Sequence, residues 1–181
     1  MARIKGITTA DLRAFAAERG AVERLRAALG EEDRRWFDEA VAVAWYDLDH
    51  QMRALTALPA ALGTSPEEAW RGFGRFSADR HVNRIHRLFF RFANPALVLE
   101  KTGQFWSRFY DTGTWTITRE ARARARGDLR GFGRPTEAHC TFLTAYVGAL
   151  FEAVGAKAVR CTHPACEVRG GDRCTFAVEW Q

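Results

Sequence analysis

Three of the four cysteines in this chain lie close together near its C-terminus. They are Cys161, Cys166 and Cys174, while the fourth, Cys140, lies upstream in a segment with helical periodicity. In a chain without a secretion signal, cysteines grouped in this way indicate a metal site more than a disulfide framework. The chemistry expected at this end of the chain is therefore the binding of a metal ion by thiolates.

The spacing around a glycine turn supplies a geometry for such a site. Cys166 and Cys174 are symmetric about Gly170, so a hairpin with a three-residue loop would place them directly opposite each other. Cross-strand Cβ atoms lie about 5 Å apart, and two thiolates at that spacing can share one tetrahedral zinc ion at about 2.3 Å each. His163 lies shortly before Cys166, and Cys140 would reach the same ion from its helix.

We expect a structural zinc ion that joins this helix to the hairpin. A closed set of four ligands leaves no position for water, so the ion would contribute to folding and not to hydrolysis. The expected ligands are Cys140, His163, Cys166 and Cys174. Cys161 is the competing fourth ligand, because it has the same strand parity as His163. Two other interpretations stay open: buried free thiols that pack as small hydrophobic groups, and a reversible disulfide between Cys166 and Cys174.

The elements that must position these residues change character near Gly113. Before this glycine the hydrophobic period is helical. The clearest start signal is Ser65-Pro66-Glu67-Glu68, which offers a capping serine, a first-turn proline and a glutamate that closes a capping box. The other predicted helices begin near Thr9, Gly30, Asp47 and Asn94, with a break at Gly20 and an end or kink at Pro59.

Beyond Gly113, short alternating segments flank one more helix. The β-branched and aromatic run over residues 114–119 predicts a strand. The alternation of Arg122, Arg124 and Arg126 with alanines favours strand structure with three guanidinium groups on one face. A helix opens at Pro135, and strands over residues 157–163 and 173–180 follow.

The sequence therefore predicts one α+β domain over residues 1–181. A helical layer over about residues 1–112 is followed, from about residue 113, by an antiparallel four-stranded sheet that one helix splits, in the order β-β-α-β-β. A chain of 181 residues is long enough to bury a full core without disulfides or metals.

Charge and hydropathy exclude several classes of partner. The formal net charge is +5, but nearly all the cations are arginines spread through the chain, so we expect no nucleic-acid partner. No apolar run approaches the roughly 20 residues that a membrane span needs, and we expect no membrane association. The N-terminus lacks the apolar stretch and cleavage site of a signal peptide. We therefore expect a cytoplasmic protein with reduced thiols.

The C-terminal cysteine motif also carries a family resemblance. The ending from Cys166 to Trp180 resembles the closing motif of the 4-vinyl reductase domain, in which a cysteine, a glycine turn and a second cysteine precede a final strand. The whole chain resembles a myxobacterial paralogous family related to that domain, through Ile4-Lys5-Gly6, Trp45-Tyr46 and the run 105–113. The resemblance implies a fold shared with haem nitric-oxide-binding domains and transport-particle subunits, which hold small-molecule pockets between helices and sheet and often dimerise.

The same resemblance bears on the metal ligands. In the aromatic-effector sensors of the 4-vinyl reductase group, zinc is held by three cysteines and a glutamate. The cysteine positions correspond to Cys140, Cys166 and Cys174 in this chain, and the glutamate position falls on His163. Histidine is a competent zinc ligand, so the resemblance implies a related site with one ligand exchanged.

Catalytic motifs are missing from the sequence. It contains no glycine-rich phosphate loop, no serine elbow and no zinc-protease helix motif. The tyrosine-x-serine-x-arginine motif of nitric-oxide sensors is also absent. His81 and His86 fit helix-surface or core-edge positions among arginines better than haem ligation. We expect a protein that is not an enzyme.

The function expected is that of a small-molecule-binding or sensory domain with a structural zinc site. Its ligand would be small and apolar, and would lie among the aromatic side chains of the helical layer. The conformational effect of ligand binding would be transmitted across a homodimer or to a partner signalling protein. One alternative is a protein–protein interaction module of the transport-subunit type, without ligand. Another is an accessory enzyme of tetrapyrrole metabolism, which the name of the related domain suggests.

Overall fold

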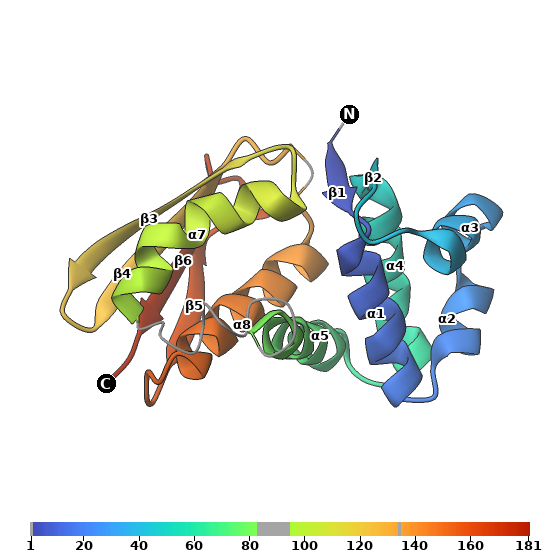
Figure 1. The fold of residues 1–181 in the computed structure, drawn as a ribbon, viewed down its shortest axis with the longest axis horizontal. Helices are drawn as coiled ribbons and strands as arrows, with labels where there is room; N and C mark the ends of the chain where they lie inside the picture. The colour runs from blue at the N-terminus through green and yellow to red at the C-terminus, as the bar shows by residue number, and fades with distance from the viewer. Residues whose placement is uncertain (1, 83–94, 134) are drawn as a thin grey trace.

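The computed structural model describes residues 2–82, 95–133 and 135–181. The helical half contains α1 (Ile7–Glu18), α2 (Val22–Ala28), α3 (Glu31–Glu39), α4 (Leu48–Leu62), α5 (Pro66–Arg80) and α7 (Pro95–Phe109). Helices α1 to α4 gather at one end of the molecule, and α7 lies along the sheet at the other end (Figure 1). Two residues that the sequence singled out, His86 and Asn94, lie outside the described residues.

Helix starts follow the capping chemistry that predicts them. The Ser65 hydroxyl accepts a hydrogen bond from the backbone N–H of Glu68 at 3.3 Å, and Pro66 occupies the first turn of α5. At the start of α4, the Asp47 carboxylate accepts from the backbone N–H of Asp49 at 3.0 Å. Each cap satisfies a backbone donor that the helix itself leaves without a partner.

The helical half differs from the prediction in two places. Helix α4 accommodates Pro59 in its last turn and continues to Leu62. Gly63 caps it with a φ of 72°, the left-handed conformation that glycine adopts without strain. A small antiparallel sheet joins β1 (Arg3–Lys5) to β2 (Trp45–Asp47), and the sequence analysis did not predict it. Strands of three residues are too short to show a period of two.

The sheet half confirms the predicted β-β-α-β-β order. It runs through β3 (Thr114–Ala121), β4 (Arg124–Arg130), α8 (Glu137–Ala153), β5 (Arg160–Ala165), a 3₁₀ turn η2 (Glu167–Arg169) and β6 (Cys174–Glu179). The four strands pair antiparallel in the order β3-β4-β6-β5, so β5 forms one edge. The molecule is an α+β protein with an antiparallel four-stranded sheet.

The predicted face of three arginines is wrong in one member. Arg122 lies in the turn between β3 and β4, because the first strand continues to Ala121 and the second begins at Arg124. Arg124 and Arg126 remain on the exposed face, where both form ion pairs with Glu120, at 3.1 and 3.3 Å. This face is a neutralised, solvated surface of the sheet.

Helices α5 and α8 lie between the two ends of the molecule (Figure 1) and pack unusually closely. A Cβ atom at Gly74 of α5 would lie 2.3 Å from the carbonyl oxygen of Phe142 and 3.1 Å from the Cβ of Ala145, both in α8. Only a glycine permits this approach. The contact fixes α8, and with it Cys140, relative to the helical half.

A membrane-spanning segment is not found among the described residues. None of their helices is both long and apolar enough to cross a bilayer.

Candidate functional site

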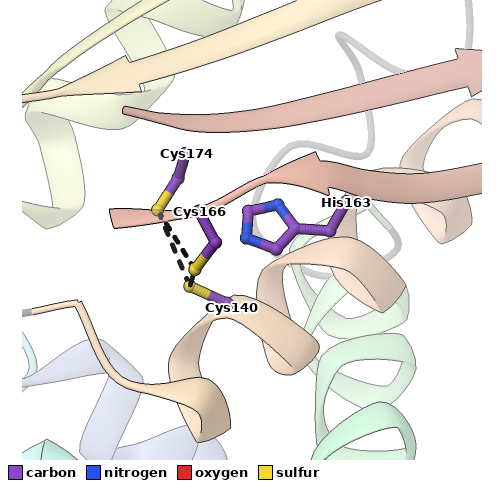
Figure 2. A group of neighbouring side chains, drawn as sticks. All are labelled: Cys140, His163, Cys166 and Cys174. Carbon is purple, nitrogen blue, oxygen red and sulfur yellow. Dashed lines mark hydrogen bonds between the residues drawn. The ribbon is translucent and has the colours of Figure 1, made fainter. Parts of the chain in front are cut away.

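The four residues predicted as metal ligands come together in the structure. Cys140, His163, Cys166 and Cys174 each offer one ligand atom, and these atoms all lie within 4.8 Å of one another (Figure 2). The three thiols form a nearly equilateral triangle, with Sγ–Sγ distances of 3.7, 3.8 and 3.9 Å. Such a set of soft donors is suited to a thiophilic transition metal.

The loop around the triangle differs from the predicted hairpin. Strand β5 ends at Ala165, and the turn η2 carries the chain to Gly170, whose φ is 85°. Cys166 therefore precedes a 3₁₀ turn and is not paired across strands with Cys174, whose partner in the sheet is Leu129. The two sulfur atoms still meet at 3.9 Å, because the turn folds Cys166 back over the start of β6.

His163 is oriented by the strand beside it. It lies where the register of β5 against β6 shifts, between Thr162 and Ala165. Its Nδ1 lies 2.8 Å from the carbonyl oxygen of Thr175, which can only accept, so Nδ1 carries the hydrogen. The other ring nitrogen, Nε2, is buried without a hydrogen-bond partner among the described residues. An imidazole held in this tautomer by a backbone carbonyl is typical of a metal ligand.

Cys161, the competing ligand, lies outside this set. It lies along β5 toward α8, where a Cβ at Gly148 would be 3.3 Å from its own Cβ. Burial raises the pKa of the Cys161 thiol to about 12, so it stays protonated at neutral pH. The described geometry therefore groups His163, and not Cys161, with the three thiols.

The three clustered thiols share their hydrogens unequally. The hydrogen bond that Cys140 donates lowers the pKa of the Cys174 thiol below its ordinary value. The same contact, followed by burial, raises the pKa of Cys140. The cluster can therefore hold one thiolate readily, while ionising all three thiols requires a cation among them.

A buried polar network that the sequence analysis did not predict joins α1, α5 and α8. The His81 ring places Nε2 at 2.7 Å from the Asp11 carboxylate and Nδ1 at 2.8 Å from the Tyr146 hydroxyl. Arg80 donates to the other carboxylate oxygen of Asp11 at 2.8 Å. His81 is buried, whereas the sequence placed it at the helix surface or at the edge of the core. One sequence feature is consistent with this network: Asp11 lies on the apolar face of α1, between Thr8 and Phe15, where a carboxylate needs a buried partner.

A second buried imidazole lies next to the cysteine cluster in sequence. His139 is 1% exposed, stacks on Phe132 at 4.7 Å and places Nε2 at 3.0 Å from the Tyr110 hydroxyl. Burial lowers the pKa of His139 to about 3, so this ring is neutral at physiological pH. The contact between His139 and Tyr110 was not predicted, because no local pattern pairs residues this far apart in the sequence.

A hollow of about 810 Å³ lies between α5, α8 and β5. Trp70 lines it from α5, Thr141 and Thr144 from α8, and Cys161 from β5. Cys140, His163 and Cys166 also border it, so the hollow reaches the cysteine cluster. Charged side chains also line it, namely Glu67, Arg71, Glu137 and Arg169, so it is not the aromatic site in which the ligand was expected to lie. Its volume is in the range of small-molecule sites in proteins.

Comparison with solved structures places the fold. No protein-family model and no curated protein matches the chain. An H-NOX protein from S. oneidensis in the Fe(II)NO ligation state is similar, with a TM-score of 0.75, 14% identity and coverage of 98% of this chain and 99% of that one. An oxygen-binding H-NOX domain related to soluble guanylate cyclases, in its oxygen complex, gives a TM-score of 0.68, 13% identity, and coverage of 97% and 92%. A third structure, described by the modulation of haem redox potential through porphyrin distortion, gives a TM-score of 0.68, 14% identity and coverage of 96% of both chains.

The fold is therefore that of the H-NOX domains, as the expected relation to haem nitric-oxide-binding proteins implied. The predicted zinc cofactor is contradicted by this comparison, because the solved structures with this fold are described with Fe(II) or haem. The zinc assignment rested on the 4-vinyl reductase resemblance and on ligand types, and neither selects one metal. Membership of the 4-vinyl reductase group and of a myxobacterial family stays a prediction.

Proposed function

We propose that the protein is a sensory domain that binds a small molecule and is not itself an enzyme. The observation that carries this proposal is the match to H-NOX structures over nearly the whole of both chains. Those relatives are described with NO or oxygen bound. The transfer to this chain is an analogy of fold, and the single-domain organisation over residues 1–181 is part of the proposal.

Two features of the site support the analogy. The hollow between α5, α8 and β5 offers about 810 Å³, enough for a small organic molecule. The network of Asp11, His81 and Tyr146 ties α1 to α5 and α8 through buried polar contacts. Buried networks of this kind have few satisfactory arrangements, so a ligand that moved α5 relative to α8 would change the position of α1. A second copy or a partner signalling protein would receive that change.

Native mass spectrometry of the full chain tests the proposal. The expected result is a complex with a co-purifying small molecule, whose mass is lost when the same sample is denatured. Trp70→Ala, which removes one wall of the hollow, should lower the occupancy. A chain that carries no small molecule, and whose Tm is unchanged by a panel of small aromatic compounds, would refute the proposal.

We further propose that Cys140, His163, Cys166 and Cys174 form one ligand set for a thiophilic transition-metal ion. The specific support is the buried Nε2 of His163, which has no hydrogen-bond partner among the described residues and lies beside three thiols (Figure 2). Elemental analysis of protein purified without a metal-affinity tag decides which element is held. About one metal atom per chain is expected; Cys166→Ser should lose it and Cys161→Ser should keep it. Equal metal content in both variants would refute the ligand set.

A further inference from the structure

One edge of the four-stranded sheet borders a groove that is longer than the hollow between α5, α8 and β5. Strand β5 forms that edge, with β6 as its one neighbour among the strands of the described residues. A second hollow of about 350 Å³ adjoins the first, and Arg71, Thr144 and Cys161 line both. The two hollows therefore form one continuous groove between β5 and the two helices, which we call the β5 groove.

The residues that line the β5 groove show that it follows the edge of the strand and not one of its faces. Five consecutive residues, 159–163, border the two hollows. Successive side chains of a strand point to opposite faces of the sheet, so a run of both parities borders one groove only along its backbone. An edge strand turns every second N–H and C=O away from the sheet. The β5 groove therefore offers backbone donors and acceptors over about 16 Å.

The narrow part of the β5 groove is cationic. Its charged lining residues are Arg71, Arg75, Arg160 and Glu152. Arg75 forms an ion pair with Glu152 at 2.6 Å. Arg160 forms no ion pair with the residues that the structure describes, and its cross-strand neighbour Glu179 is paired with Arg124 at 3.7 Å. Arg160 can therefore donate to an incoming carboxylate, the acceptor that a guanidinium binds best.

The wide part of the β5 groove combines balanced charges with apolar surface. Its charged lining residues are Glu67, Arg71, Glu137 and Arg169, two of each sign. The indole N–H of Trp70 donates to the carbonyl oxygen of Leu55 at 2.8 Å, so its polar atom is already satisfied and the ring offers apolar contact. Val168, which is 48% exposed, lines the same part. An apolar side chain bound here would remove both residues from water.

We propose that the β5 groove binds an extended segment of a partner protein, which adds a strand to the edge of β5. The segment carries a carboxylate that meets Arg160 and an apolar side chain that lies beside Trp70. Main-chain hydrogen bonds supply affinity in this mode of recognition, and the side-chain contacts supply specificity. The inference rests on the sensory function proposed above for its role: a small molecule beside Trp70 would occupy the wide part of the groove and exclude the segment.

Selection from a peptide library tests the proposal. The full chain, as purified, selects from displayed random heptapeptides, and the enriched peptides are synthesised and titrated by fluorescence anisotropy. We expect a motif with an acidic and an apolar residue at a constant spacing. Arg160→Glu should weaken binding about tenfold or more, because a charge-assisted hydrogen bond is lost. The matched control is Arg122→Glu in the exposed turn between β3 and β4, which should keep the Kd within about twofold.

Methylation of the peptide backbone tests strand addition without altering the protein. Each amide of the best peptide is N-methylated in turn, which removes one donor at a time. Because every second N–H of an added strand points toward the edge, affinity should be lost at alternate positions and kept at the positions between them. Tolerance of methylation at every position overturns the inference. So does a library without an enriched motif, or equal binding by the wild type and Arg160→Glu.

The outcomes separate this inference from the sensory function. If a small molecule co-purifies with the chain but no peptide binds, the β5 groove is not a docking site and the sensory function survives. If a peptide binds with the alternating pattern while no small molecule is found, the docking site stands and the sensory function fails.

Discussion

Replacing Gly74 with alanine tests the contact that joins the helical half to the sheet half. The new methyl carbon would lie 2.3 Å from the carbonyl oxygen of Phe142 and 3.1 Å from the backbone nitrogen of Tyr146. Both are backbone atoms of α8, so no side-chain rotation relieves the overlap. Restoring ordinary van der Waals contact requires α5 and α8 to separate by about 1 Å at this point, in an interior that is close-packed.

The size of the effect follows from two opposing contributions. Overpacking of a well-packed interior costs about 1–3 kcal/mol, and a clash with backbone belongs at about the upper end of that range. Alanine in place of glycine within a helix returns roughly 1 kcal/mol. The expected net loss for Gly74→Ala is about 2 kcal/mol, or a fall in Tm of roughly 4–8 °C for a chain of this length.

Gly72→Ala is the matched control for this measurement. Gly72 lies on the same helix, and its added methyl would meet only the ring edge of Phe15, at 3.3 Å. We expect this variant to be within about 1 kcal/mol of the wild type. Urea unfolding of both variants, followed by circular dichroism, gives the comparison. If Gly74→Ala is as stable as Gly72→Ala, the close approach of α5 and α8 is wrong.

Three further predictions concern buried polar and packing contacts. Tyr146→Phe should lower the free energy of unfolding by about 1–2 kcal/mol, because Nδ1 of His81 loses its partner; an unchanged urea midpoint would contradict the network. Burial alone would raise the pKa of Asp33, but hydrogen bonds from Arg53 and from His50 lower this pKa. Its stabilising contribution is thus present above the unfolded pKa and is lost as the pH falls through the lower folded pKa. Between pH 5 and 2 the wild type should therefore lose more stability than Asp33→Asn, and parallel pH profiles would refute this. Gly127→Ala would place a methyl 2.5 Å from the Trp115 ring and should cost about 1–3 kcal/mol, whereas an unaltered Tm would show that the ring is not so placed.

Local chemistry made much of the architecture predictable. Helix starts at Asp47 and Ser65 depend on side chains within three residues of the cap, so the sequence alone reports them. The prediction that Arg122 lies on a strand was wrong because the turn carries no local sequence signal. A two-residue turn without glycine or asparagine leaves no mark on an arginine–alanine pattern that continues through it.

In the candidate site, too, the features that depend on local sequence were predictable and the long-range contacts were not. Cysteines are rare and chemically distinctive, so their grouping around Gly170 predicted the cluster even though the hairpin geometry was wrong. The contact of Asp11 with His81 joins residues far apart in sequence, and no local pattern pairs them. Metal identity could not be read from ligand types, because cysteine and histidine serve several ions.

A native mass spectrum of the full chain, recorded with the absorption spectrum of the same sample, tests the central claim most directly. The account predicts a complex with a co-purifying small molecule, whose mass is lost when the same sample is denatured. A spectrum of the bare chain, together with a Tm that a panel of small aromatic compounds leaves unchanged, would contradict it.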